Sequence, residues 1–174
     1  IVEEERPRRV KKARKPKSVT KKKKKKKGET NIKKPLEKML VAVLDFEGKN
    51  MESSDAGIIT DFVSQEMLNS GYFKVLERGA INDIMSEVNF QQSGCTSAEC
   101  AVQIGKILAV KKMVVGSVSK LGKKFFITVR MVDVETSQID LATSIGANVP
   151  LEELPGHVGR LIEQMVEKLF AEEE

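Results

Sequence analysis

One unbroken apolar stretch constrains the fold of this chain more than any other feature. Residues 39–44 (MLVAVL) are all apolar, and Asp45 then Gly48 interrupt the run. A strand covered on one face alternates between apolar and polar residues, whereas a strand covered on both faces reads as a continuous apolar run. The stretch therefore predicts a central strand with helices on both sides.

A second apolar run, residues 113–118, has the same character, and three helical patterns separate it from the first. The first pattern covers residues 55–70, where a Ser54 or Asp55 cap is expected and Gly71 fits the helix end. Its apolar residues repeat at helical spacing and should cover the sheet. They are Ile58, Ile59, Phe62, Val63, Met67 and Leu68.

The other predicted elements complete a layered domain. A short strand is expected over 72–76, helices over 78–89 and 96–109, and strands over 112–119, 125–132 and 138–147. The last three strands have short connections and should form an antiparallel meander. The domain ends with an amphipathic helix that Pro155 starts, and the apolar stripe of this helix should be core rather than partner surface. The predicted fold class is therefore α/β, a layered sandwich with a mixed sheet covered by helices.

The distribution of charge divides the 174 residues into two parts. Residues 1–34 hold 17 basic and 4 acidic residues, a net charge of +13, whereas residues 35–174 carry a net charge of −8. We therefore predict a tail over 1–34 and a folded domain over 35–174. A domain of this length buries enough surface to fold without a metal or crosslinks.

The tail is dominated by like charge, which favours disorder. Seven consecutive lysines have no apolar face to bury, so the segment cannot repay its ordering entropy. It is either a solvated linker or an element that binds a polyanion such as acidic lipid or nucleic acid. The block comprises Lys21, Lys22, Lys23, Lys24, Lys25, Lys26 and Lys27.

The two cysteines flank a predicted helix start. Thr96 and Glu99 have the spacing of a capping box, which would put Cys95 at N′ and Cys100 at N4, two positions that touch in a hydrophobic staple. This spacing favours a structural disulfide in an oxidising compartment. A metal site, a redox dithiol and two reduced buried thiols are the alternatives that the sequence leaves open.

Residues that carry chemistry are few in this sequence. The single histidine, His157, has no partner nearby in the chain, and Gly48 with Lys49 lacks the remainder of a phosphate loop. Asp45 follows a central strand, where α/β sheets often bind ligands, but it could equally cap the next loop. We therefore expect no catalytic residues, cofactor, metal or small-molecule substrate.

Short motifs along residues 36–170 resemble those of the curli-secretion-component (CsgG-like) family, which includes periplasmic domains of lipoprotein activators of penicillin-binding proteins. The resemblance lies in the order and spacing of the motifs over some 130 residues. They are residues 41–46 (VAVLDF), 70–78 (SGYFKVLER), 92–94 (QSG), 104–109 (IGKILA), 115–118 (VGSV) and 130–136 (RMVDVET).

The resemblance implies a non-enzymatic protein of the bacterial envelope that takes part in outer-membrane or cell-wall assembly. Its partner would be another envelope protein or a second copy. The periplasm is the expected location, with any export signal or lipid anchor upstream of Ile1. Two departures are visible: the connection at 121–124 is too short for membrane-spanning hairpins, and Ser137 stands where the family usually has glycine, which should make that turn either longer or strained.

Overall fold

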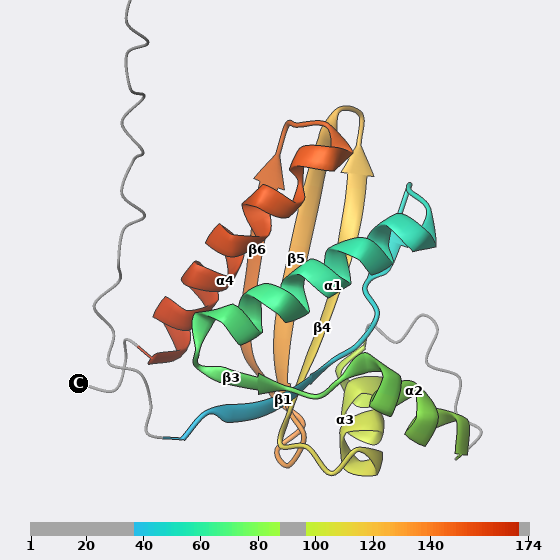
Figure 1. The fold of residues 1–174 in the computed structure, drawn as a ribbon, viewed down its shortest axis with the longest axis vertical. Helices are drawn as coiled ribbons and strands as arrows, with labels where there is room; N and C mark the ends of the chain where they lie inside the picture. Colours follow the sequence, from blue (N-terminus) through green and yellow to red (C-terminus); the bar gives the residue numbers. More distant parts are fainter. Residues whose placement is uncertain (1–36, 88–96, 171–174) are drawn as a thin grey trace, which may run out of the picture.

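The computed structural model describes residues 37–87 and 97–170, and in this part of the chain a mixed sheet lies between two layers of helices (Figure 1). Helices α1 and α4 cover one face of the sheet, and α2 and α3 lie at one end of the other face. The α/β sandwich predicted from the sequence is confirmed. None of the described helices is long and apolar enough to cross a bilayer.

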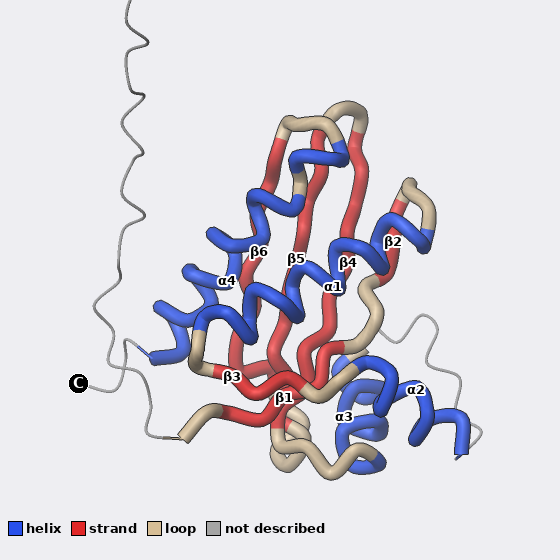
Figure 2. The backbone as a smooth tube through the Cα atoms, viewed as in Figure 1, coloured by secondary structure: helices blue, strands red, loops and turns tan. Residues whose placement is uncertain are grey.

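The strands follow the order β3-β1-β4-β5-β6, and β2 pairs with β4 outside this path (Figure 2). Strand β1 is parallel to β3 and β4, whereas β4, β5 and β6 form the predicted antiparallel meander. The strands are β1 (Met39–Val43), β2 (Glu47–Lys49), β3 (Phe73–Val75), β4 (Lys112–Leu121), β5 (Lys124–Asp133) and β6 (Ile139–Ala147). The helices are α1 (Ser53–Ser70), α2 (Arg78–Glu87), α3 (Ala98–Ile107), η1 (Leu151–Glu153) and α4 (Pro155–Phe170).

The two apolar runs lie side by side in the centre of the sheet. Val41, Ala42 and Val43 of β1 pair with the first residues of β4, and all three are buried. Alternate residues of β1 enter different cores, because successive side chains of a strand point to opposite faces. Val41 and Val43 pack with α1 and α4, whereas Ala42 and Leu44 pack with α2 and α3. The prediction of a central strand covered on both faces is confirmed.

The chain bends away from β4 immediately after β1 and then returns to it as β2. At the bend, Phe46 is buried and its amide donates to Thr60 Oγ1 over 3.0 Å. The Thr60 hydroxyl in turn donates to the Ala56 carbonyl, 2.9 Å away. Opposite the bend lies Gly116 of β4, where a Cβ would come within 2.7 Å of the Phe46 ring. Glycine is thus required at this position because the ring occupies the space of a side chain.

Strand β2 is a strand that the sequence patterns did not predict. It has three residues, Glu47, Gly48 and Lys49, and pairs with Ser117–Ser119 of β4 in parallel. A polar segment of this length has neither an apolar run nor an alternating pattern, so its pairing depends on the bend at Phe46 rather than on its own residues.

Two helices end, and one turn is made, with a residue in the left-handed region of backbone conformation. Gly71 ends α1 with φ 83°, as predicted from glycine's ease in the left-handed region. After α3, the Ala109 amide bonds to Lys106 O and the Val110 amide to Gly105 O, which is the Schellman pattern with alanine (φ 52°) at the glycine position. Ser137 also has a positive φ, 60°, so the predicted strain at that turn is confirmed.

Two predicted helix caps are wrong by one to three residues. Helix α1 begins at Ser53, and its N-cap is Glu52 without a side-chain hydrogen bond, so neither Ser54 nor Asp55 caps it. Helix α3 is capped by Ser97, whose hydroxyl accepts from the Cys100 amide over 3.2 Å. A serine immediately before the helix competes with the threonine cap that the capping-box spacing suggested.

Candidate interaction surface

Helix α1 has large apolar side chains on its solvent-facing side as well as on the side that packs against the sheet. Its buried side faces the sheet through Ile59, Val63 and Met67, each no more than 1% exposed. On the opposite side Ile58, Phe62 and Leu68 are 53%, 41% and 48% exposed. We call this side the α1 outer face. Its residues are Ile58, Asp61, Phe62, Gln65, Leu68 and Asn69.

All six large apolar residues of α1 were expected to cover the sheet, which is wrong for three of them. The signal was present in the spacing. The apolar residues come as adjacent pairs, 58–59, 62–63 and 67–68. Neighbouring residues are about 100° apart around a helix, so three such pairs span more than one buried stripe. One member of each pair therefore faces away from the sheet.

Helix α1 contributes no positively charged side chain to its outer face. Helix α1 has three carboxylates, Asp55, Asp61 and Glu66, and no lysine or arginine. Gln65 Nε2 donates to Asn69 Oδ1 over 3.0 Å, which orders the two amides beside the apolar side chains. An apolar surface rimmed by ordered polar groups is typical of a protein-binding site.

Arg78 fixes the edge of this face. Its guanidinium contacts Asp45 Oδ1 at 2.5 Å and Asp61 Oδ1 at 2.6 Å, and so joins the end of β1 to α1. The side chain of Asp45 thus takes part in an ion pair, which is neither of the two roles that the sequence suggested for it. The pairs are partly exposed and contribute little to stability, but they hold Asp61 in place next to Phe62.

Helix α4 provides a contrast on the same face of the sheet. Its buried residues are Val158, Leu161, Ile162, Met165 and Val166, so the prediction that its apolar stripe is core is confirmed. Its exposed positions are Gly156, Arg160, Gln164, Glu167 and Lys168, without a large apolar side chain. The apolar exposure of α1 is therefore a property of that helix and not of the whole helical layer.

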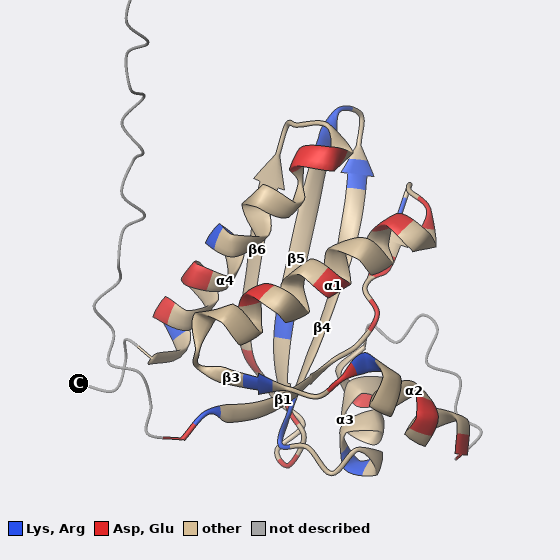
Figure 3. Cartoon of the chain, viewed as in Figure 1, with Lys and Arg blue, Asp and Glu red and all other residues tan. Residues whose placement is uncertain are grey.

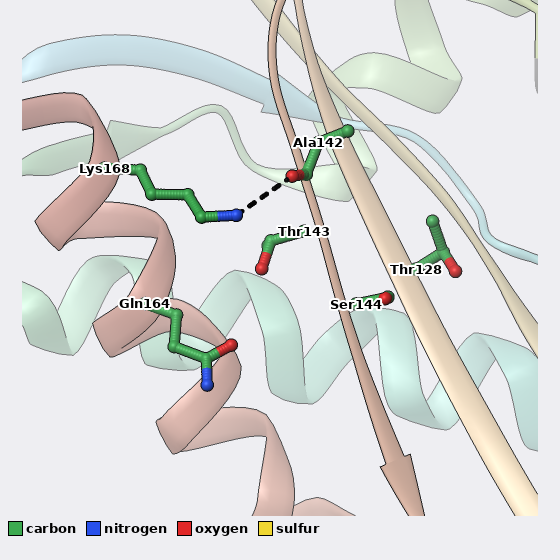
Figure 4. A pocket seen from close by; sticks show the side chains of 6 residues that line it. All are labelled: Thr128, Ala142, Thr143, Ser144, Gln164 and Lys168. Carbon is green, nitrogen blue, oxygen red and sulfur yellow. Dashed lines mark hydrogen bonds between the residues drawn. The ribbon is translucent and has the colours of Figure 1, made fainter.

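A shallow polar hollow lies where α4 crosses the outer edge of β6 (Figure 4). Its volume is about 300 Å³. Lys168 Nζ donates to the Ala142 carbonyl over 3.4 Å, so part of the free edge of β6 already has a partner. The other lining residues are Thr128, Thr143, Ser144 and Gln164. This set contains hydroxyls and amides but no paired acid and base.

A cluster of three charged side chains joins the start of β4, the end of β5 and the start of β6. Lys112 Nζ contacts Asp133 Oδ2 at 2.6 Å and Asp140 Oδ2 at 2.5 Å. The Lys112 ammonium, followed by the Thr136 amide, holds the pKa of Asp133 well below its usual range. Partial burial acts to lower the pKa of Lys112, but its hydrogen bonds to the two aspartates outweigh burial and raise that pKa.

Replacing Asp133 by asparagine should make stability less dependent on pH. A depressed carboxyl pKa stabilises the fold above the unfolded value of about 3.9, and this contribution is lost as the pH falls through the folded value. We therefore expect Asp133→Asn to lower the urea midpoint at pH 7, with a smaller difference from wild type at pH 3. Asp83→Asn, on the exposed side of α2, is the matched control. An equal difference at both pH values would show that Asp133 acts through packing alone.

The remaining predicted site residues are placed only in part. Cys100 lies in the first turn of α3 at N3, not at the predicted N4, and Cys95 lies outside the described residues, so their disulfide stays a prediction. The lysine block also lies outside the described residues. His157 Nδ1 contacts Arg160 at the start of α4. Among residues 37–87 and 97–170, no group of His, Cys, Asp and Glu is arranged to hold a metal ion.

The fold and surface define a class: a layered α/β domain whose most distinctive described feature is an exposed apolar helix face. The family described as curli production assembly/transport component CsgG matches residues 22–126. The match covers more than half of the chain, and the chain belongs to this family. The resemblance found in the sequence motifs is thereby confirmed. No curated protein matches the chain.

Several solved structures share the fold at low sequence identity. The LpoB C-terminal domain from Salmonella enterica has a TM-score of 0.55 and 12% identity, covering 64% of this chain and 83% of that chain. Lipoprotein GNA1162 from Neisseria meningitidis has a TM-score of 0.56 and 11% identity, with coverages of 75% and 98%. PelC from Paraburkholderia phytofirmans, a dodecamer, has a TM-score of 0.50 and 14% identity, with coverages of 81% and 96%. These likenesses establish the fold of the domain.

Proposed function

We propose that this chain is a non-enzymatic protein-interaction module of the bacterial cell envelope, and that it binds another envelope protein through the α1 outer face. Residues 35–174 are the module, and residues 1–34 are a basic tether. Family membership supports the assignment, and so does the fold shared with a lipoprotein of Neisseria meningitidis. In this proposal the module works in the periplasm, in outer-membrane or cell-wall assembly.

The observation that carries the proposal is the exposure of Ile58, Phe62 and Leu68 on one helix. Two of them are four residues apart and therefore lie next to each other on the helix surface. Burying what is still exposed of the three side chains would stabilise a complex by on the order of 2–4 kcal/mol. An exposed phenylalanine flanked by aliphatic side chains has the composition of an interface anchor.

The partner that fits this face is a segment with its own apolar side chains and a positive charge at the rim. Asp61 is the carboxylate on this face, and together with Asp45 it outnumbers the one cation at the edge, Arg78. Complementary charge at a rim guides association and excludes wrong partners, whereas the apolar centre supplies most of the affinity. A second copy of the chain is the alternative partner, and the experiment below distinguishes it from a different protein by the mass of what is captured.

Capture from an envelope extract with the full chain tests the proposal. Phe62→Asp should lower recovery of the partner more than ten-fold, the effect of removing an interface anchor. Gln164→Asp adds the same charge at an exposed position of α4 and should leave recovery unchanged. Thermal unfolding of both variants checks that each is folded. Equal recovery by wild type, Phe62→Asp and Gln164→Asp would exclude the α1 outer face as the binding surface.

A further inference from the structure

The connection between β4 and β5 forms a narrow tip at the end of two long strands. The strands pair over ten positions up to Leu121 and Lys124, and Gly122 takes φ 60° in the two-residue turn between them. In Figure 1 this hairpin projects beyond the helices of the domain. We call residues 120–124 the hairpin tip. Its sequence is Lys-Leu-Gly-Lys-Lys.

The hairpin tip presents an apolar side chain to solvent. Leu121 is 70% exposed, the highest value among the exposed large apolar residues of the described chain. Phe126 is 39% exposed and pairs with Ser119, so it lies on the same sheet face as Leu121. Its ring lies close to Gly146 of β6, where a Cβ would come within 3.2 Å of it. Leu121 and Phe126 thus form a small apolar surface at this end of the sheet.

Lysines lie on both faces of the hairpin beside this apolar surface. Lys120, Lys123 and Lys124 belong to the tip, where Figure 3 shows the blue of lysine and arginine. Strand β2 brings Lys49 to the same end, because Asn50 Nδ2 donates to the Lys120 carbonyl over 3.3 Å. Lys120 itself lies over the Phe125 ring, 5.5 Å from its centroid. The carboxylates at this end include those of η1, which adjoins a hollow that Lys120 and Leu151 line.

We propose that the hairpin tip rests on an anionic lipid surface. Leu121 would enter the boundary between headgroups and acyl chains, while the lysines contact the headgroups. A protruding turn with one aliphatic side chain fits a flat, deformable surface better than a shaped protein pocket, and basic residues beside an apolar anchor are the composition of interfacial segments. This contact is independent of the α1 outer face, which lies on a different element.

Tryptophan fluorescence gives a local test, because the chain has no tryptophan. Leu121→Trp is examined in the full chain with vesicles of phosphatidylglycerol and phosphatidylcholine, and with vesicles of phosphatidylcholine alone. Ile139→Trp is the matched control: Ile139 is 46% exposed and begins β6 at the opposite end of the sheet. Both variants keep the basic tail, so any binding through the tail is the same in each.

We expect Leu121→Trp emission to shift to shorter wavelength and to be quenched by brominated acyl chains on the anionic vesicles only. Ile139→Trp should remain unchanged. Adding Lys123→Gln or Lys124→Gln to Leu121→Trp should weaken this insertion about five-fold per lysine.

Three results would overturn the inference. The first is sedimentation of the chain with anionic vesicles while the Leu121→Trp signal stays unchanged, which would assign binding to the tail. The second is an equal response of Ile139→Trp. The third is an equal response on neutral vesicles, since the proposal requires negative headgroups. Each of these results leaves binding through the α1 outer face unaffected, so the two proposals fail separately.

Discussion

Replacing Gly116 by alanine should lower the free energy of unfolding by about 2–3 kcal/mol. A Cβ at this position would lie 2.5 Å from the Thr128 carbonyl and 2.7 Å from the Phe46 ring. Neither neighbour can move freely, since Thr128 is paired in the sheet and Phe46 is buried at the bend between β1 and β2. Urea denaturation measures the loss.

The control is the same substitution at a glycine with open space. Gly79 lies in the first turn of α2, and a Cβ there meets nothing within 4 Å. Gly79→Ala should leave the urea midpoint unchanged or raise it slightly, because alanine is a better helix former than glycine. If Gly116→Ala were as stable as Gly79→Ala, Phe46 would not be packed against β4 as described.

Replacing Thr60 by valine should cost about 2 kcal/mol of folding free energy. Valine has nearly the same shape but lacks the hydroxyl that accepts from the Phe46 amide. Thr60 is 1% exposed, so water cannot readily replace the lost partner and the amide is left unsatisfied. The bend at Phe46 therefore depends on one hydroxyl from α1.

Thr60→Ser separates the hydrogen bond from the packing. Serine retains the hydroxyl and removes one methyl group, so its loss should be about 1 kcal/mol. Equilibrium unfolding of the three proteins should rank them, from most to least stable, as wild type, Thr60→Ser and Thr60→Val. The reverse order of the two variants would mean that the methyl group, and not the hydroxyl, stabilises the bend.

The sequence predicted the sheet well where burial dictates the residues. Residues 39–44 are apolar without interruption because β1 has a core on each side, whereas a strand with one solvent-facing side would alternate. The meander was equally predictable, since Gly122 and the short turn near Ser137 mark the ends of β-rich segments. Element types followed from these patterns, and the family resemblance rested on motifs at the same places.

The candidate site was harder to predict, because exposure is a tertiary property. Ile58 and Ile59 are identical in the sequence, but one is 53% exposed and the other 1%. Only the position of α4 and the sheet decides which of the two is buried. Strand β2 and the contact of Arg78 with Asp61 likewise depend on segments far apart in the chain, which local patterns do not describe.

The hairpin tip illustrates a different limit. The turn itself was predicted, because glycine followed by a lysine between two strands is a hairpin signal. That Leu121 remains exposed was not predicted, since a leucine at the end of a strand is often covered. The structure shows that no described element packs over it closely enough to bury it. Its role as a membrane contact is therefore an inference from the structure.

The most direct test of the recognition role is photo-crosslinking in cells that produce the protein, with a photoreactive phenylalanine analogue at position 62 or, as a control, at position 164. The account predicts a discrete crosslinked product from position 62 and none of that mass from position 164, because only the first lies on the α1 outer face. Absence of a product at position 62, or the same product at both positions, would contradict it.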